Sequence, residues 1–222
     1  MKFDLHTHTK YSKKCGALPP KKLVHAAMQR GLNGIAVTDH DTIDGALEAK
    51  KYETKDFAVI IGCEITTNEG EITGLFLHHP IMSKEAEDVI DEIHKQGGIA
   101  VVPHPFDTYR AKRLKEVDKY CSKIDAIEVF NSRCIDEKSN LMARQFALEN
   151  NMPRVGGSDA HNLNEIGLGY TLVPEMEGRD TKDLILTAIN SFSTDGNGNR
   201  SPLYNHAWTK LRKWRRRIVS NR

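Results

Sequence analysis

The residue types in this sequence that are best suited to chemistry are histidines and acids placed two positions apart. His6 and His8 form an H-x-H pair, and Asp159 and His161 form a D-x-H pair. Because alternate residues of a strand point to the same face, each pair can present two ligands to one cation. Neutral imidazole and carboxylate together suit Zn, Mn or Fe. The two pairs therefore indicate a metal site.

Further potential ligands lie where short apolar runs end. His40 ends the run GIAVTDH, Glu64 lies in FAVIIGCEI, and His104 follows IAVV. The carboxyl ends of strands meet at one mouth of a βα barrel, so we expect these residues to converge. Each element alone has an ordinary structural explanation, but five of them in different βα units favour a metal cluster, since burying so many ionisable groups without metal is costly. A carboxylate such as Glu64 can bridge two ions, so more than one metal is expected.

The remaining histidines are interpreted as surface or satisfied histidines. His25 and His94 fall inside expected helices, away from the mouth. The pair His78-His79 is expected in a loop, and His206 belongs to the C-terminal tail. We therefore leave these residues out of the predicted site.

The elements that must position the ligands alternate between β-rich runs and helical patterns, which is typical of an α/β protein. Strands are expected at FDLHTHT, GIAVTDH, FAVIIGCEI, GEITGLFL, IAVVPHP, AIEVF, RVGGSDAH and YTLV. Helices are expected after Pro19-Pro20, from about Asp41, after Ser83, and near 111–121, 136–150 and 180–192. About seven βα-like units favour a closed or nearly closed barrel over an open sheet.

The composition limits the possible function classes. The chain has 222 residues, 39% of them apolar, and a formal net charge of +2, so it has enough apolar residues for one core and is not a polyanion binder by overall charge. Its four cysteines form no C-x-x-C pair and are too few for a disulfide framework. The N-terminus lacks an apolar leader, and no stretch approaches the ~18 apolar residues of a membrane span. We expect a soluble, cytoplasmic protein without a transmembrane segment.

The domain division follows from a change in composition near residue 193. The stretch STDGNGNRSP is rich in Gly, Asn and Ser and has no apolar residue, which predicts a flexible linker over 193–205. The catalytic barrel is therefore expected over 1–192, and a basic tail over 206–222.

The tail has the pattern of a basic amphipathic helix. Trp208, Leu211, Trp214 and Ile218 follow one another at intervals of three, three and four residues, with Lys and Arg between them. Such a helix can contact nucleic acid through phosphates and base stacking, rest on an anionic membrane surface, dock on the body of the protein or remain solvated. The sequence leaves these alternatives open.

The segments that carry the ligands resemble the PHP family, the polymerase and histidinol phosphatase family. The similar segments occur in family order over roughly residues 3–173, and they are DLHTHTKYS (4–12), GIAVTDHDTIDG (34–45), GCEITT (62–67), GEITGLF (70–76), VVPHPFD (101–107), EVFNSR (128–133) and GSDAH (157–161). The resemblance implies a distorted (β/α)7 barrel that holds two to three divalent ions and hydrolyses phosphate esters by metal-activated water.

Position by position, the resemblance also implies a role for each ligand. The first ion is held by His6, His8, Glu64 and Asp159. Glu64 bridges to a second ion beside His104, and the third ion is held by His40 and His161. The implied catalytic residues are His6, His8, Glu64, His104 and Asp159.

The sequence departs from the family pattern at two positions. The family usually has an Asp shortly after H-x-H as a ligand of the third ion, whereas this chain has Lys14 or Cys15 there. A lysine weakens that site, and a thiolate can replace the missing ligand and favour softer ions. Glu71 stands where many members have a histidine, and it can still ligate the second ion.

Three arginines are candidates for binding the phosphate of the substrate, because bidentate arginine is the usual phosphate partner. Arg110 and Arg113 follow HPFD, and Arg133 follows EVFN, on the mouth side of their strands. The alternative is that all three are solvated loop residues.

Three functions are compatible with these residues. The first is a phosphatase or phosphodiesterase that acts on a phosphorylated small molecule or on nucleotide and oligonucleotide ends, with the basic tail favouring nucleic acid. The second is a histidinol-phosphatase-like enzyme, which the short connections of a 222-residue chain make less favourable. The third is a metal-binding accessory module without catalysis, and the retention of all seven ligand types His6, His8, His40, Glu64, His104, Asp159 and His161 speaks against it.

Overall fold

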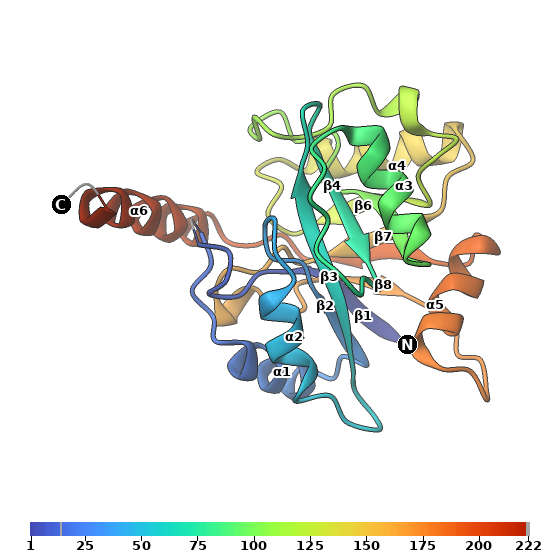
Figure 1. Ribbon diagram of the computed structural model, residues 1–222, viewed down its shortest axis with the longest axis horizontal. Coiled ribbons are helices and arrows are strands. Elements are labelled where there is room, and N and C mark those ends of the chain that lie inside the picture. The colour runs from blue at the N-terminus through green and yellow to red at the C-terminus, as the bar shows by residue number, and fades with distance from the viewer. Residues whose placement is uncertain (14, 221–222) are drawn as a thin grey trace.

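The computed structural model describes residues 1–13 and 15–220. One sheet of nine strands runs through it, and helices pack around that sheet (Figure 1). The strands are β1 (Lys2–Thr7), β2 (Gly34–Val37), β3 (Ala58–Thr66), β4 (Glu71–Leu75), β5 (Ile99–Val102), β6 (Ala126–Asn131), β7 (Arg154–Gly157), β8 (Gly169–Leu172) and β9 (Asp195–Gly198). The helices are α1 (Pro20–Gln29), α2 (Asp44–Lys50), α3 (Ala86–Lys95), α4 (Glu137–Glu149), α5 (Thr181–Asn190) and α6 (Leu203–Ser220), with short 3-10 helices η1 (Val117–Tyr120) and η2 (Leu163–Glu165).

The sheet curls until its first strand approaches its seventh. The strand order is β7-β6-β5-β4-β3-β2-β1-β8-β9, with β1 to β3 and β5 to β7 parallel and β4 antiparallel to both neighbours. Thr7 forms a bridge to Ala160, and Asp159 N donates to the carbonyl of His6 at 2.7 Å. The prediction of an α/β fold with a nearly closed barrel is therefore confirmed.

The barrel is distorted where β3 and β4 form a hairpin with no helix between them. Thr66 pairs with Glu71 across this hairpin, so the first residue of β4 lies beside the last residue of β3. An antiparallel strand begins where its parallel neighbours end. The hairpin therefore brings Glu71 to the same mouth as the carboxyl ends of the other strands.

The helix expected near 111–121 is wrong for most of its length, because only η1 forms there. The preceding loop instead packs against the β3–β4 turn, and Glu71 N donates to the carbonyl of Lys112 at 2.8 Å. A Cβ at Gly70 would lie 2.4 Å from Leu114 Cα, so the two backbones are in close contact. Tertiary packing of the loop has overridden a local helical pattern.

Apolar side chains fill the barrel and its surroundings. Helix α3 buries Ala86, Val89, Ile90 and Ile93 on one face, as its spacing predicts. The residual space inside the barrel, lined in part by Leu75, is only about 10 Å³. A packed interior leaves the mouth as the place for a site.

The predicted flexible linker over 193–205 is wrong in its central part, because Asp195–Gly198 form β9. This strand pairs antiparallel with β8, and the carboxylate of Asp195 accepts hydrogen bonds from Arg144 at 2.7 Å and Arg154 at 3.2 Å. A Cβ at Gly196 would lie 2.3 Å from the carbonyl oxygen of Val155. Glycine is needed here for close backbone packing, which the composition alone does not distinguish from flexibility.

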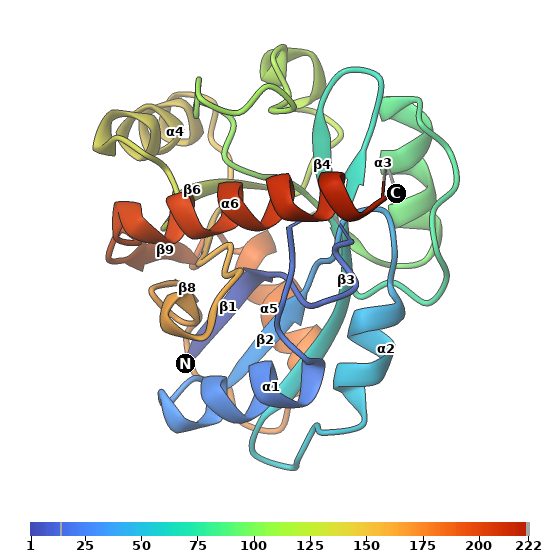
Figure 2. The same cartoon turned by 90° about the vertical axis from the view of Figure 1, so that its left-hand side faces the viewer.

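Helix α6 follows β9 and runs across the side of the molecule where the strands end (Figure 2). Its docked face is polar. Thr209 accepts a hydrogen bond from Arg133 at 3.3 Å, and Arg212 donates to Asn162 Oδ1 at 2.8 Å. Trp208 and Trp214 are exposed, so the aromatic residues of the predicted amphipathic pattern do not form the docked face. Within the described residues, no helix combines the length and apolarity that crossing a membrane requires.

Candidate metal centre

The eight predicted ligands meet at the mouth of the barrel. Seven of them come from the carboxyl ends of parallel strands or the residues that follow, and Glu71 comes from the start of antiparallel β4. All are buried except His40, whose side chain is 28% exposed. The full set is His6, His8, His40, Glu64, Glu71, His104, Asp159 and His161. Residues from sequence positions 6 to 161 thus form one cluster.

The carboxylate of Glu64 lies at the centre of four imidazoles. Its Oε1 is 3.0 Å from His104 Nε2. Its Oε2 lies 3.1 Å from His40 Nδ1, 3.4 Å from His8 Nε2 and 3.5 Å from His6 Nε2. Each of the two carboxylate oxygens of Glu64 therefore contacts at least one histidine, which is the arrangement that a ligand bridging two ions requires.

The carboxylate of Asp159 forms a second focus of the cluster. Its Oδ1 lies 3.1 Å from His8 Nε2, 3.4 Å from His161 Nδ1 and 3.8 Å from His6 Nε2. Its Oδ2 accepts a hydrogen bond from Arg110 Nη2. Asp159 thus contacts histidines through Oδ1 and the guanidinium of Arg110 through Oδ2.

The polar atoms of this cluster fit divalent metal ions. Glu64 Oε2, Asp159 Oδ1, His40 Nδ1 and His104 Nδ1 are buried and have no hydrogen-bond partner among the described residues. Ligand atoms that share one ion at about 2.0–2.2 Å lie roughly 3.0–3.6 Å apart, close to the spacings around both carboxylates. Unpartnered buried donors and acceptors are costly, and metal coordination removes that cost.

The described residues contain four groups of three whose ligand atoms lie within 4.8 Å of one another. Glu64 and His6 each belong to two groups, which suits neighbouring ions that share ligands. The groups are His8, His40 and His161; His6, His8 and Glu64; His6, His104 and Asp159; and His40, Glu64 and Glu71. These groups include the candidate ligand Glu71.

The pKa values in the cluster depart from their ordinary ranges in ways that a metal would resolve. Burial disfavours the imidazolium of His6, but carboxylates around it, first that of Glu128, raise its pKa well above the usual range. Burial lowers the pKa of His40 to about 4. Burial and the charge of Glu64 raise the pKa of Glu71 to about 8. A bound cation favours neutral imidazole and ionised carboxylate, which are the forms that coordinate metal.

Two of the candidate ligands have strained backbones. The φ angles of His104 and Asp159 are 34° and 53°, in the left-handed region that side chains other than glycine rarely adopt. Such strain is maintained only where the surrounding structure enforces it, and it occurs often at functional sites.

Sequence reasoning missed Glu128, which organises two of the histidines. Its Oε1 lies 3.0 Å from His6 Nδ1, and its Oε2 accepts hydrogen bonds from His104 N at 2.7 Å and Asn131 Nδ2 at 3.0 Å. An acid inside the apolar run AIEVF was the available signal. Carboxylates of this kind orient metal-ligating histidines and raise their basicity.

Asp39 was also missed as an organising residue. It accepts hydrogen bonds from the backbone amides of Thr9 at 2.7 Å and Ser12 at 3.0 Å, and from Ser12 Oγ at 2.6 Å. Ser12 Oγ in turn lies 3.1 Å from His8 Nδ1. Asp39 therefore fixes the loop after β1 and, through Ser12, the orientation of His8.

The two departures from the family pattern have different outcomes. Glu71 lies in the cluster, with its Oε1 3.8 Å from His40 Nδ1. Cys15 is buried, but its thiol belongs to none of the four potential metal groups of the described residues. Lys14 lies outside the described residues.

The three predicted phosphate-binding arginines are placed differently. Arg110 donates to Asp159 and, at 3.0 Å, to Asp107, so its guanidinium lies beside the cluster. Arg133 is buried and paired with Glu165 at 2.5 Å. Arg113 contacts only the carbonyl of Arg110 among the contacts found in the described residues, so the structure does not bring it into the cluster.

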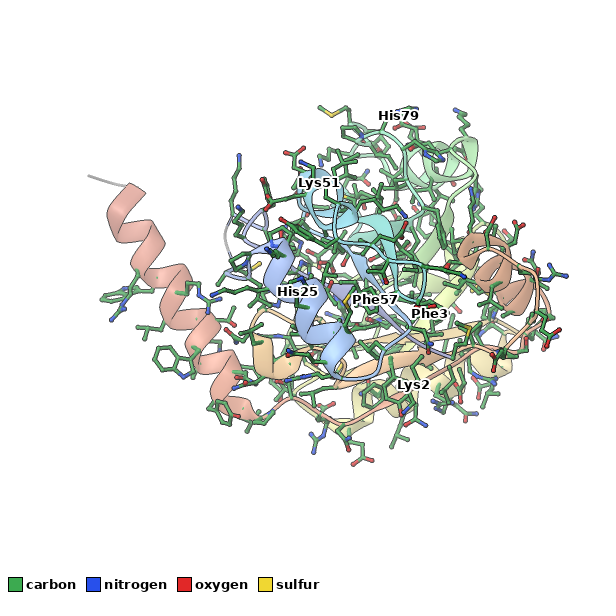
Figure 3. All side chains as sticks on the ribbon, turned by 90° about the horizontal axis from the view of Figure 1, so that it is seen from below. Lys2, Phe3, His25, Lys51, Phe57 and His79 are labelled. Carbon is green, nitrogen blue, oxygen red and sulfur yellow. The ribbon has the colours of Figure 1, made fainter. Side chains whose placement is uncertain are left out.

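Four further histidines lie outside the cluster, as expected. His25 on the outward face of α1 and His79 in a loop at one end of the molecule are both exposed (Figure 3). His78 is also exposed, and His94 pairs with Asp125 at 2.9 Å. His206 differs from them, because it lies on the helix that crosses the mouth.

Comparison with family models identifies the class of this fold and site. The model of the PHP domain matches residues 4–125, and the model of the PHP-associated region matches residues 137–191. The chain therefore belongs to the PHP family. Proteins of this class are metal-dependent phosphoesterases, which hydrolyse phosphate-ester bonds, and this chain is an enzyme of that class.

Curated relatives support the same family. An uncharacterized protein of Methanocaldococcus jannaschii is 33% identical over 190 residues, covering 83% of this chain and 75% of the relative. A second from the same organism is 41% identical over 147 residues, covering 60% of this chain and 82% of the relative. A 5'-3' exoribonuclease of Haemophilus influenzae is 36% identical over 137 residues, which are 53% of this chain and 47% of that protein.

Solved structures confirm the fold. A two-domain protein from Bacteroides vulgatus containing a predicted PHP-like metal-dependent phosphoesterase superimposes with a TM-score of 0.74 at 22% identity, over 90% of this chain and 65% of that chain. PsfC from Pseudomonas syringae superimposes with a TM-score of 0.71 at 18% identity, over 96% of this chain and 97% of that chain. At these identities the likeness concerns the fold alone.

Proposed function

We propose that this protein hydrolyses phosphate esters at nucleotide or oligonucleotide ends, using two to three divalent ions of Zn, Mn or Fe. The observation that carries the proposal is the position of Glu64, whose buried, unpartnered Oε2 lies within 3.5 Å of imidazole nitrogens of His6, His8 and His40. A purely structural acid would be satisfied by hydrogen-bond donors.

The residues that would hold the ions are the eight cluster residues, in the groups described above. When bound, the ions supply positive charge to neutralise the phosphoryl oxygens and to activate a water molecule. Glu128 and Asp39 keep the histidines in the orientation that coordination requires. Arg110 places a fixed guanidinium next to Asp159, where it can bind the phosphoryl group of the substrate.

A depression lined by three lysines, one of them paired with Glu69, supports an extended anionic substrate. A cavity of about 590 Å³ lies between the β3–β4 turn and the 111–119 segment, and Lys112, Lys115 and Lys119 line it together with Glu69 and Glu116. Lys112 Nζ lies 3.8 Å from Glu71 Oε1, so one lysine of this lining is a neighbour of a candidate metal ligand. The phosphates of a nucleic-acid strand carry negative charge that these lysines can bind. The similarity to a 5'-3' exoribonuclease also supports a nucleic-acid substrate.

The test combines metal analysis with a substrate panel. Protein purified without chelator is analysed for metals and assayed with Mn²⁺ against an aryl phosphate, nucleoside mono- and bisphosphates, short single-stranded RNA and DNA, and histidinol phosphate. We expect two or three metals per chain and release of phosphate or nucleotide from nucleotide or oligonucleotide ends.

Other results of this panel would redirect the proposal. A preference for histidinol phosphate would support the small-metabolite phosphatase instead. Less than one metal per chain together with no hydrolysis of any substrate would support a binding module.

A further inference from the structure

The face of α6 that is turned toward the barrel includes His206. Thr209 and Arg212 on this helix contact Arg133 and Asn162 of the body. His206 precedes Thr209 by three residues, which is just under one helical turn, so both side chains lie on the same face. His206 is thereby held over the mouth that contains the metal ligands.

The His206 ring turns one nitrogen away from solvent. The residue as a whole is only partly buried, yet its Nε2 is fully buried and has no hydrogen-bond partner among the described residues. Burial, followed by the charges of Arg133 and Arg110, lowers the pKa of His206 to about 4, so the ring is neutral near pH 7. A neutral imidazole can donate one N–H, and leaving that group buried and unpaired is costly.

The charged groups around His206 favour an anion that is small and oxygen-rich. The two cations that act on it most strongly are Arg133 and Arg110, and the acids Asp159 and Asp107 act less. Arg110 is already fixed on Asp159 at the edge of the metal cluster. Arg133 is committed to Glu165 and Thr209, so the guanidinium of Arg110 and the imidazole N–H of His206 are the donors that can share an anion. Phosphate oxygens are the acceptors that match them.

We propose that His206 is a phosphate-binding residue of the active site, whose Nε2–H donates a hydrogen bond to a non-bridging oxygen of the substrate phosphoryl group that Arg110 holds beside the metal centre. This inference rests on the proposed function and deepens it. It makes α6 one wall of the substrate site. His206 binds the phosphate in the ground state, and it does not transfer a proton.

The experiment measures phosphate binding separately from turnover. Full-length, metal-loaded wild type, His206→Ala and His206→Gln are titrated with inorganic phosphate by calorimetry and assayed with an aryl phosphate. We expect the Kd for phosphate and the KM to rise about tenfold in His206→Ala, with kcat within about threefold. Glutamine should recover most of the affinity, because its amide can donate an N–H in place of the imidazole.

The matched control is His25→Ala, which removes an exposed helical histidine far from the mouth and should leave both constants unchanged. An unchanged Kd in His206→Ala, at wild-type metal content and Tm, overturns the phosphate-binding role, as does a loss confined to kcat. If the wild type hydrolyses no phosphate ester but binds phosphate in a His206-dependent way, the proposed function fails while this binding role stands.

Discussion

Two buried glutamates at the mouth of the barrel have opposite surroundings. Glu64 and Glu165 are both fully buried. Glu165 is saturated with donors: Arg133 at 2.5 Å, Ser201 Oγ at 2.7 Å and the backbone amide of His161 at 2.9 Å. Glu64 has histidine nitrogens around it, and its Oε2 has no hydrogen-bond partner among the described residues.

The difference separates a structural acid, Glu165, from a candidate metal ligand, Glu64. The Glu165 network joins the backbone at His161 to Arg133, which holds Thr209 on α6, so it fastens the C-terminal helix to a ligand loop. Burying the unpartnered Oε2 of Glu64 is costly, and a bound cation would remove that cost. Substitution of Glu64 should therefore reduce metal binding and activity, whereas substitution of Glu165 should reduce stability.

The largest effect is expected for Glu64→Gln. Loss of the bridging charge should remove at least one bound ion per chain and lower kcat/KM for an aryl phosphate by about 1000-fold or more, because two of the four ligand groups share this carboxylate. Elemental analysis and steady-state kinetics measure both. In the wild type a chelator should lower Tm, whereas Glu64→Gln should show little chelator-dependent shift. Wild-type metal content in this variant would contradict the bridging role.

Glu165→Gln should lose stability and not metal. It leaves the buried guanidinium of Arg133 without its carboxylate, which should reduce the free energy of unfolding by about 3–5 kcal/mol. Denaturant unfolding measures this loss, and metal content per folded chain should stay near that of the wild type. Glu149→Gln, at the exposed end of α4, is the control for a surface glutamate. If Glu165→Gln loses metal at unchanged stability, the distinction between the two glutamates is wrong.

Asp4 is a third buried acid, and its surroundings are intermediate between those of Glu64 and Glu165. It accepts backbone hydrogen bonds from Ser158 at 2.8 Å and Gly167 at 2.9 Å but has no cationic partner among its hydrogen bonds. Burial raises its pKa from 3.8 to about 6. The folded state thus keeps a proton that the unfolded state loses, so the contribution of Asp4 to stability is greatest below about pH 4 and falls as pH rises to about 6. In metal-free protein, the stability difference between wild type and Asp4→Asn should shift by about 2–3 kcal/mol over this window.

Denaturant unfolding at several pH values from about 3.5 to 7 measures that shift. Because Asn does not titrate, the pH dependence of the difference in unfolding free energy between wild type and Asp4→Asn reports the titration of Asp4. A difference that stays constant across the window would show that Asp4 titrates normally in the folded protein.

The smallest effect is expected for Glu128→Gln, which keeps the shape of an orienting side chain but removes its charge. The amide can still contact His6 and His104 N, so metal affinity should fall by only about tenfold, with the fold intact. Competition with a metal-sensitive chelating dye measures the affinity. A loss as large as that of Glu64→Gln would make Glu128 a ligand rather than an orienting residue.

The elements and most of the ligands could be predicted from the sequence because their signals are local. The order of the strands and the periodicity of α3 depend on neighbouring residues and hold in the structure. The strand ends differ from the prediction: β1 ends at Thr7 and β7 at Gly157, so His8, Asp159 and His161 lie just after their strands. The acids Glu128 and Asp39 could not be assigned, because their roles depend on partners in other segments, as in the pairing of Glu128 with His6.

The C-terminal region shows where local patterns were insufficient. Glycine-rich composition predicted a linker, yet Gly196 serves close packing against Val155, a contact between strands 41 residues apart in the sequence. The basic amphipathic pattern of α6 left open whether the helix docks on the body, and the contacts to Arg133 and Asn162 dock it through its polar face.

The sequence by itself thus determined the family, the α/β barrel and the set of candidate metal ligands, since these depend on short motifs and on the order of strands. Only the tertiary structure decided that Glu64 is shared among histidines, that Arg133 fastens α6, and that His206 faces the mouth. Those properties arise from contacts between residues far apart in the chain. Such contacts exist only once the barrel has closed and the helix has docked.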